Sequence, residues 1–146
     1  MKVLLLGGTQ QAMSIAQTLL AHNSASSDAN GQPVKLIYSI AGIVRQPALN
    51  CSIHSGGFSQ FAPDSTSLKN SSKRASQQGL EHFIKRQKIE KVIDATHPYA
   101  VTMSTTASIV CESLNIPLLR YHRPPWQATE QDRWINVTNW AEAQKA

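Results

Sequence analysis

The stretch VLLLGGTQQA, Val3 to Ala12, decides the class of fold. Its apolar run, Val3 to Leu6, predicts a strand buried on both faces, and Gly7-Gly8 closes that strand. The residues that follow predict a helix, because apolar side chains recur at spacings of three and four: Ala12, Ile15, Ala16, Leu19 and Leu20. Thr9 precedes this helix and is suited to cap it.

The same alternation of strand and helix continues along the chain. Further strands are expected at residues 34–41, 51–54, 91–95 and 116–119, and further helices at residues 77–88 and 101–114. The segment from Phe58 to Ser76 is polar and aperiodic, and we expect it to be irregular. Strands that alternate with helices in this way predict right-handed βαβ units. The expected fold is therefore α/β, a doubly wound parallel sheet of Rossmann-like type.

The end of the chain departs from this pattern. Two prolines, Pro124 and Pro125, exclude a helix there and favour an extended path. Residues 134–137 then predict another strand, and residues 140–143 another helix. One strand and one helix cannot form a core, so they pack back on the first domain or belong to a second one. We favour the second reading: a Rossmann-like domain at 1–121, a linker at 122–133, and the beginning of a truncated α/β domain at 134–146.

Composition limits the classes of protein that remain. The net charge is +5, and no basic block is interleaved with aromatic residues, so nucleic acid is not the expected partner. A solvated basic surface and an anionic partner both fit this charge. Cys51 and Cys111 form no CxxC pair, and Val3 to Leu6 is too short for a signal sequence or a membrane span. We expect a soluble, cytoplasmic protein with reduced thiols.

Three loops at the predicted carboxyl edge of the sheet, where such folds bind ligands, carry unusual residues. They are Gly7-Gly8-Thr9, Gly56-Gly57-Phe58 and Thr96-His97-Pro98. The first matches the dinucleotide pattern G-x-G-x-x-G imperfectly, since Thr9 and Ala12 replace two glycines. Its backbone N–H groups could still face a phosphate at the start of the helix. A tight turn without a ligand explains the same residues, so this pattern alone leaves both readings open.

The end of the second strand bears on which dinucleotide could bind. NAD enzymes tend to carry an acid there, whereas an arginine favours the 2′-phosphate of NADP. No acid follows Leu36 to Ile40, and Arg45 does. If a dinucleotide binds, we expect NADPH.

His97 is the strongest candidate for a catalytic residue, because it follows a strand at the ligand-binding edge and Pro98 restricts its backbone. A structural histidine is an equally open reading. The histidines show no metal-ligand spacing, so no metal is expected.

Together these motifs resemble the precorrin-6A reductase family of cobalamin biosynthesis. The resemblance rests on LLLGGTQQA, SIAG, GGF, DATHPYA and LLRYHRPPW, in the family's order and over nearly the whole chain. It implies NADPH-dependent reduction of a double bond in precorrin-6A or its cobalt form. It also implies a polycarboxylate tetrapyrrole as the partner, and a second α/β domain of which only the start is present here.

The resemblance also assigns roles to residues. It places the cofactor at Gly7, Gly8, Thr9, Gln10, Ser39, Ala41 and Gly42. Arg45 joins this set as the arginine that favours the 2′-phosphate of NADP. It gives catalytic roles to His97 and Thr96, and substrate contacts to Tyr99, Arg120 and Arg123. Asp94 is instead expected to cap or order its loop, because a buried carboxylate is costly without partners.

Two other kinds of protein have a fold of this type. A non-catalytic NADP(H)-binding module or sensor of the same fold would carry the same glycine turn. A short-chain reductase is disfavoured, because none of Tyr38, Tyr99 and Tyr121 begins a Tyr-x-x-x-Lys pair. We further expect the chain alone to fold and bind NADPH, to be inactive, and to self-associate through its C-terminal segment, whose apolar residues lack cover.

Overall fold

The computed structural model describes residues 1–25, 33–42, 47–63, 72–121 and 127–144. Its centre is one parallel sheet of five strands in the order β3-β2-β1-β4-β5. The strands are β1 (Lys2–Leu6), β2 (Lys35–Ile40), β3 (Ser52–Ser55), β4 (Lys91–Asp94) and β5 (Leu118–Arg120). Each predicted strand up to residue 119 is therefore confirmed, with small shifts at the ends.

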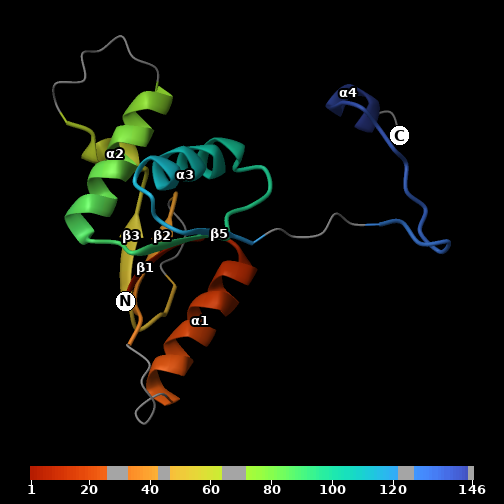
Figure 1. Cartoon of the computed structure of the whole chain (residues 1–146). Coiled ribbons are helices and arrows are strands. Elements are labelled where there is room, and N and C mark those ends of the chain that lie inside the picture. The colour runs from red at the N-terminus through yellow and green to blue at the C-terminus, as the bar shows by residue number, and fades with distance from the viewer. Residues whose placement is uncertain (26–32, 43–46, 64–71, 122–126, 145–146) are drawn as a thin grey trace.

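Helices cover both faces of the sheet (Figure 1). Helix α1 (Gln10–Ala25) lies on one face, and α2 (Ser72–Gln87) and α3 (Val101–Ser113) lie on the other. A short 3₁₀ helix, η1 (Phe58–Phe61), packs against α2. The doubly wound α/β sheet predicted from the sequence is confirmed.

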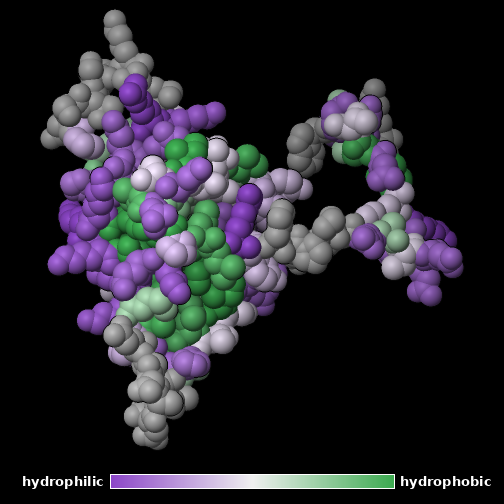
Figure 2. Space-filling view, viewed as in Figure 1, coloured by the Kyte–Doolittle hydropathy of each residue, from purple (hydrophilic) through white to green (hydrophobic). Residues whose placement is uncertain are grey.

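The sheet has a core on each side because side chains alternate along its strands. Leu4 and Leu6 point to the face of α2 and α3, where they join Leu80, Phe83 and Val110. Val3 and Leu5 point to the face of α1 and join a second cluster with Ala12, Ala16 and Tyr38. All four side chains are buried, as expected for a central strand between two layers. In Figure 2 apolar surface gathers over the sheet and along α1, while α2 carries mostly hydrophilic residues.

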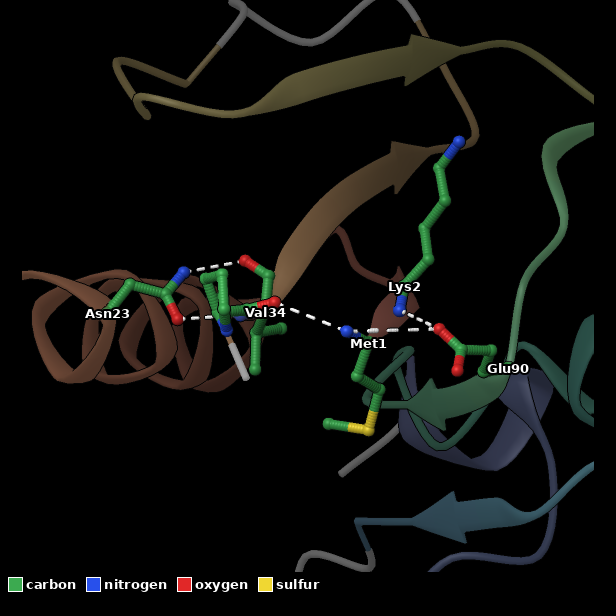
Figure 3. A network of polar contacts seen from close by, with 6 residues as sticks. Met1, Lys2, Asn23, Val34 and Glu90 are labelled. Carbon is green, nitrogen blue, oxygen red and sulfur yellow. Dashed lines mark hydrogen bonds and ion pairs between the residues drawn. The ribbon is translucent and has the colours of Figure 1, made fainter. Parts of the chain in front are cut away.

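Hydrogen bonds stabilise the edge of the sheet at which its strands begin (Figure 3). The Asn23 side chain, near the end of α1, donates to the Val34 carbonyl and accepts from the Val34 amide at 2.6 and 2.8 Å. The Glu90 carboxylate, next to β4, accepts a hydrogen bond from the Lys2 amide of β1. These contacts link the end of α1 to the start of β2, and the start of β1 to the start of β4. They all lie at the edge of the sheet opposite to its carboxyl edge.

Two predicted segments are wrong in the structure. Phe58 to Ser76 is not irregular throughout: Phe58 is buried in η1, and α2 begins at Ser72. The polar residues Ser72 to Arg74 are exposed, so this first helical turn carried no apolar period for the sequence to reveal. Residues 134–137 form no strand, because no other described strand lies beside them; the helix predicted at 140–143 is present as α4 (Trp140–Ala143).

The C-terminal residues are solvent-exposed wherever the structure describes their side chains from 127 to 144. Among the described residues, no helix has both the length and the apolar character to cross a membrane.

Candidate functional site

A cleft of about 270 Å³ opens at the carboxyl edge of the sheet. The strand order reverses at β1, with β2 on one side and β4 on the other, and ligands bind at this switch point in doubly wound folds. Four segments form the cleft: the turn after β1 with the start of α1, the end of β4 with the loop after it, α3 through Ser104, and the end of β5. Its lining residues are Gly8, Thr9, Gln10, Gln11, Asp94, Ala95, Thr96, His97, Pro98, Ser104, Arg120 and Tyr121.

The two glycines after β1 are required for different reasons. A side chain at Gly7 would overlap the ring of the buried Tyr38, and the Gly7 amide donates to the Ser39 carbonyl at 2.8 Å. Gly8 has a φ of +108°, a conformation that other residues rarely adopt. The space where its Cβ would stand is empty to 4 Å. The turn therefore presents bare backbone to the cleft, which permits close approach by a ligand.

Thr9 joins this turn to β4. Its hydroxyl donates to the Ala95 carbonyl at 2.9 Å and accepts from the Ala12 amide at 3.0 Å. The second contact is the predicted N-cap of α1. Since both bonds are internal, the Thr9 side chain fixes the start of α1 against the loop after β4, while neighbouring Gln10 and Gln11 line the cleft.

A network of hydrogen bonds orders the side of the cleft formed by β4, the loop after it and α3. One oxygen of Asp94, Oδ1, accepts from the Thr96 amide at 3.1 Å and from the Thr96 hydroxyl at 2.7 Å. The Thr96 hydroxyl also lies 3.3 Å from that of Ser104 on α3. Because Thr96 gives its only hydroxyl proton to Asp94, Ser104 is the donor in this pair. The loop-ordering role predicted for Asp94 is confirmed.

The second oxygen of Asp94 is differently placed. Among the described residues, Oδ2 is buried without a hydrogen-bond partner, and the Asp94 side chain is 2% exposed. The Arg120 Nε lies 3.7 Å from it, an ion-pair distance that is too long for a hydrogen bond. Arg120 itself is half-exposed, so its guanidinium is accessible from the cleft.

His97 and Tyr99 form the outer rim. The Nδ1 atom of His97 accepts a hydrogen bond from the Tyr99 amide at 3.3 Å, which leaves Nε2 to carry the proton in the neutral ring. The two rings stand 5.1 Å apart between centroids. His97 lines the cleft, whereas Tyr99 is 90% exposed and does not line it.

A second hollow of about 280 Å³ lies on the other side of the glycine turn. It is lined by Gly8, Thr9, Gln10, Met13, Tyr38, Ile40 and Pro47. Gly8, Thr9 and Gln10 belong to both hollows, so one turn separates two spaces along the edge of the sheet.

The structure brings only some of the predicted site residues together. Gly8, Thr9, Gln10, Thr96, His97 and Arg120 line the cleft. Gly7 lies behind it against Tyr38, and Ser39 is buried in β2. Ala41 and Gly42 follow β2 but line neither hollow. Arg45 and Arg123 lie outside the described residues.

Sequence reasoning gave no role in a site to Ala95, Ser104 and Tyr121 of the cleft. It likewise gave none to the other residues of the second hollow: Met13, Tyr38, Ile40 and Pro47. Ser104 stands at the fourth residue of α3, and only the packing of α3 against the loop after β4 turns its hydroxyl to Thr96. Tyr38 resembles an ordinary core residue of a strand.

No group of three His, Cys, Asp or Glu side chains that could hold a metal ion is found among the described residues.

Known proteins are similar to this chain in sequence and in fold. The family model for precorrin-6x reductase CbiJ/CobK matches residues 2–146. The chain is 34% identical over 126 residues to a precorrin-6A reductase of Mycobacterium tuberculosis (strain CDC 1551 / Oshkosh), covering 86% of this chain and 41% of that protein. It is 32% identical over 143 residues to a precorrin-6A reductase of Rhodobacter capsulatus, covering 97% of this chain and 47% of that protein.

A solved structure described as CobK precorrin-6A reductase superposes with a TM-score of 0.71 at 32% identity, covering 99% of this chain and 48% of the other. The chain thus spans less than half the length of each of these relatives. Because the family model extends over the whole stretch that forms the sheet and the cleft, this chain belongs to the precorrin-6x reductase CbiJ/CobK family.

Proposed function

We propose that this chain forms the cofactor-binding half of an NADPH-dependent reductase that acts on precorrin-6A or its cobalt form. The observation that carries the proposal is the pair of hollows that meet at Gly8, Thr9 and Gln10, at the switch point of the sheet. A dinucleotide has two nucleoside halves joined by a pyrophosphate, which matches two spaces on either side of one bare turn. Membership of a reductase family supports this reading.

The turn after β1 fits a pyrophosphate. It leads into the N-terminus of α1, a helix of 16 residues whose dipole favours an anion. The open space at Gly8 leaves room for a phosphate against the backbone. In this proposal Gly7, Gly8, Thr9 and Gln10 hold the cofactor's centre. Ser39, Ala41 and Gly42 support the adenosine side, and Arg45 contacts the 2′-phosphate.

The side of the cleft formed by the loop after β4 fits the nicotinamide end of the cofactor. When bound, the nicotinamide supplies the hydride that reduces a double bond of the macrocycle. His97 and Thr96 orient the ring system, and His97 can deliver the accompanying proton from Nε2. Arg120, Arg123 and Tyr99 contact the substrate. A polycarboxylate is attracted by guanidinium groups, and that of Arg120 belongs to a half-exposed side chain that lines the cleft.

The cofactor part of the proposal is tested by titrating NADPH and NADH into the 146-residue protein and following ligand fluorescence. NADPH should bind more tightly. Arg45→Ala should remove about tenfold or more of this preference, the value of a charge-assisted contact. Arg74→Ala, an exposed substitution on α2, is the matched control and should leave the preference intact. Equal affinities in the unsubstituted protein would refute the assignment to NADPH.

The catalytic part requires an enzyme of the relatives' full length. Arg120→Gln and Arg123→Gln should raise the substrate concentration needed for half-maximal rate. His97→Ala should instead slow NADPH oxidation at saturating substrate in a stopped-flow experiment. NADPH binding with no reduction of precorrin-6A in the unsubstituted enzyme would identify a non-catalytic NADP(H)-binding module.

The arrangement of domains is also part of the proposal. Residues 1–121 form the Rossmann-like domain, 122–133 connect, and 134–146 begin a second α/β domain. The relatives' greater length supports this division, since about half of each lies beyond the matched region. Such an enzyme would work in the cytoplasm, where the tetrapyrrole and NADPH are both available.

A further inference from the structure

Asp94 holds a polar atom that the loop-ordering role does not use. Its Oδ1 is satisfied twice by Thr96, but its Oδ2 is buried, has no hydrogen-bond partner among the described residues, and belongs to a residue that lines the cleft. A buried acceptor without a partner costs free energy. Such a cost is tolerated where a ligand supplies the missing donor.

Arg120 does not remove this need. Its Nε stands 3.7 Å from Oδ2, beyond hydrogen-bond reach, and its side chain is half-exposed. Ser104 is engaged with Thr96, on the side of the carboxylate's other oxygen. Asp94 is among the residues that line the cleft, so we infer that a donor would reach Oδ2 from that side.

The chemistry of Oδ2 selects among ligand groups. A carboxylate oxygen accepts hydrogen bonds and repels other carboxylates, so it disfavours the acidic side chains of a tetrapyrrole. Ribose hydroxyls and the carboxamide N–H₂ of a nicotinamide riboside are donors. Building on the proposed function, we propose that Asp94 positions the nicotinamide half of the cofactor by accepting a hydrogen bond at Oδ2 from one of these donors.

The substitution Asp94→Asn tests this with little change of shape. Both donors of Thr96 point at Oδ1, so the asparagine places its amide oxygen there and its NH₂ at the position of Oδ2. The acceptor that faces the ligand then becomes a donor. Arg120→Gln is the companion variant, because it removes the neighbouring cation and leaves Oδ2 in place.

Three probes separate the possible sources of the hydrogen bond. NADP⁺ carries both donors, its 3-acetylpyridine analogue lacks the carboxamide N–H, and 2′,5′-ADP lacks the whole nicotinamide riboside. Calorimetry should show that Asp94→Asn weakens NADP⁺ binding about tenfold or more and leaves 2′,5′-ADP binding unchanged, which also reports that the variant is folded. If the analogue loses the same factor, the ribose hydroxyl is the donor; if it loses none, the carboxamide is.

The overturning results are equally defined. Equal loss for NADP⁺ and 2′,5′-ADP, or loss for neither, removes Asp94 from the nicotinamide half. If the asparagine variant does not fold, Arg120→Gln decides. A retained preference for NADP⁺ over 2′,5′-ADP supports the assignment to Asp94. A lost preference would instead show that Arg120, acting as a donor, holds the nicotinamide half. If the unsubstituted protein binds none of the three probes, the proposed function itself is refuted.

Discussion

At the scale of single residues, the contact between Gly7 and Tyr38 sets the shape of the glycine turn. Gly7→Ala should lower the free energy of unfolding by about 1–3 kcal/mol, because the new methyl group overlaps the Tyr38 ring. Tyr38→Leu should relieve that overlap, so the double variant should be less destabilised than the sum of the two single ones. Urea denaturation of the four proteins measures this coupling; strict additivity would show that the ring does not determine the choice of glycine.

We expect His54 to make the fold sensitive to acid. Burial lowers the pKa of His54 below its usual value near 6.5, and its ring packs among Phe58, Phe61 and Phe83. A lowered pKa in the folded state means that the unfolded chain binds the proton more readily. The stabilisation of the neutral ring is therefore full above pH 6.5 and is lost as the pH falls through the lower folded value.

Denaturation between about pH 7.5 and pH 5.5 checks this dependence. His54→Leu should show a smaller fall in unfolding free energy over that window than the unsubstituted chain. His82→Gln, an exposed substitution on α2, should keep the original dependence. Identical pH profiles for the chain and its His54 variant would assign the acid sensitivity to other groups.

At the scale of elements, the contact of α2 with η1 depends on Gly79. A Cβ at this position would overlap the Phe58 carbonyl. Alanine normally stabilises a helix by about 1 kcal/mol relative to glycine. The sign of the change in unfolding free energy therefore shows whether α2 and η1 are in close contact. Gly79→Ala should destabilise the protein in urea, whereas Arg74→Ala on the same helix should have almost no effect. A stabilising Gly79→Ala would show that the two helices are not in close contact.

The sequence predicted elements well where apolar periodicity was strong. Val3 to Leu6 and the stripe from Ala12 to Leu20 gave β1 and α1 directly, because burial on a sheet imposes those patterns. The first turn of α2 was missed because its residues are polar and exposed. Residues 134–137 carry a strand-like pattern, but a strand also requires a neighbour to pair with, which a local pattern cannot supply.

The candidate site was predictable to a similar extent. The motif residues Gly8, Thr96 and His97 were found because they follow strands at the ligand-binding edge. The roles of Ser104 and of the Asp94 oxygen that lacks a hydrogen-bond partner among the described residues were not, since they come from the packing of α3 against the loop after β4. A sequence shows which side chains follow the strands and so lie at the carboxyl edge of the sheet. Whether each polar atom there has a hydrogen-bond partner can be seen only in the structure.

At the scale of the whole molecule, the 146-residue protein should fold but should not turn over substrate. Its sheet has a core on each face, whereas the relatives it matches are about twice as long. Hydride transfer needs both reactants held together and shielded from water, and we expect this to require the part of the relatives that lies outside the matched region. Absorbance at 340 nm should show no consumption of NADPH with precorrin-6A. Steady consumption by a purified monomer would contradict this expectation.

The exposed C-terminal residues should promote self-association. Trp134, Ile135 and Val137 are 46%, 66% and 39% exposed, which leaves apolar surface without cover. Sedimentation velocity should show concentration-dependent association that the double substitution Trp134→Ser with Ile135→Ser reduces. A matched double substitution at exposed polar residues of the same segment, Glu130→Ser with Gln131→Ser, should leave it unchanged. A monomer at all concentrations would exclude association through this segment.

The central claim is that the turn after β1 and the loop after β4 form one dinucleotide site. Amide chemical shifts of the isotope-labelled protein, recorded during an NADPH titration, test it most directly. We predict that the largest shifts fall on Gly8, Thr9 and Gln10, with accompanying shifts at Thr96 and His97, because these residues line the cleft. Unchanged amides at the glycine turn under saturating NADPH, or shifts confined to other parts of the sheet, would contradict the account.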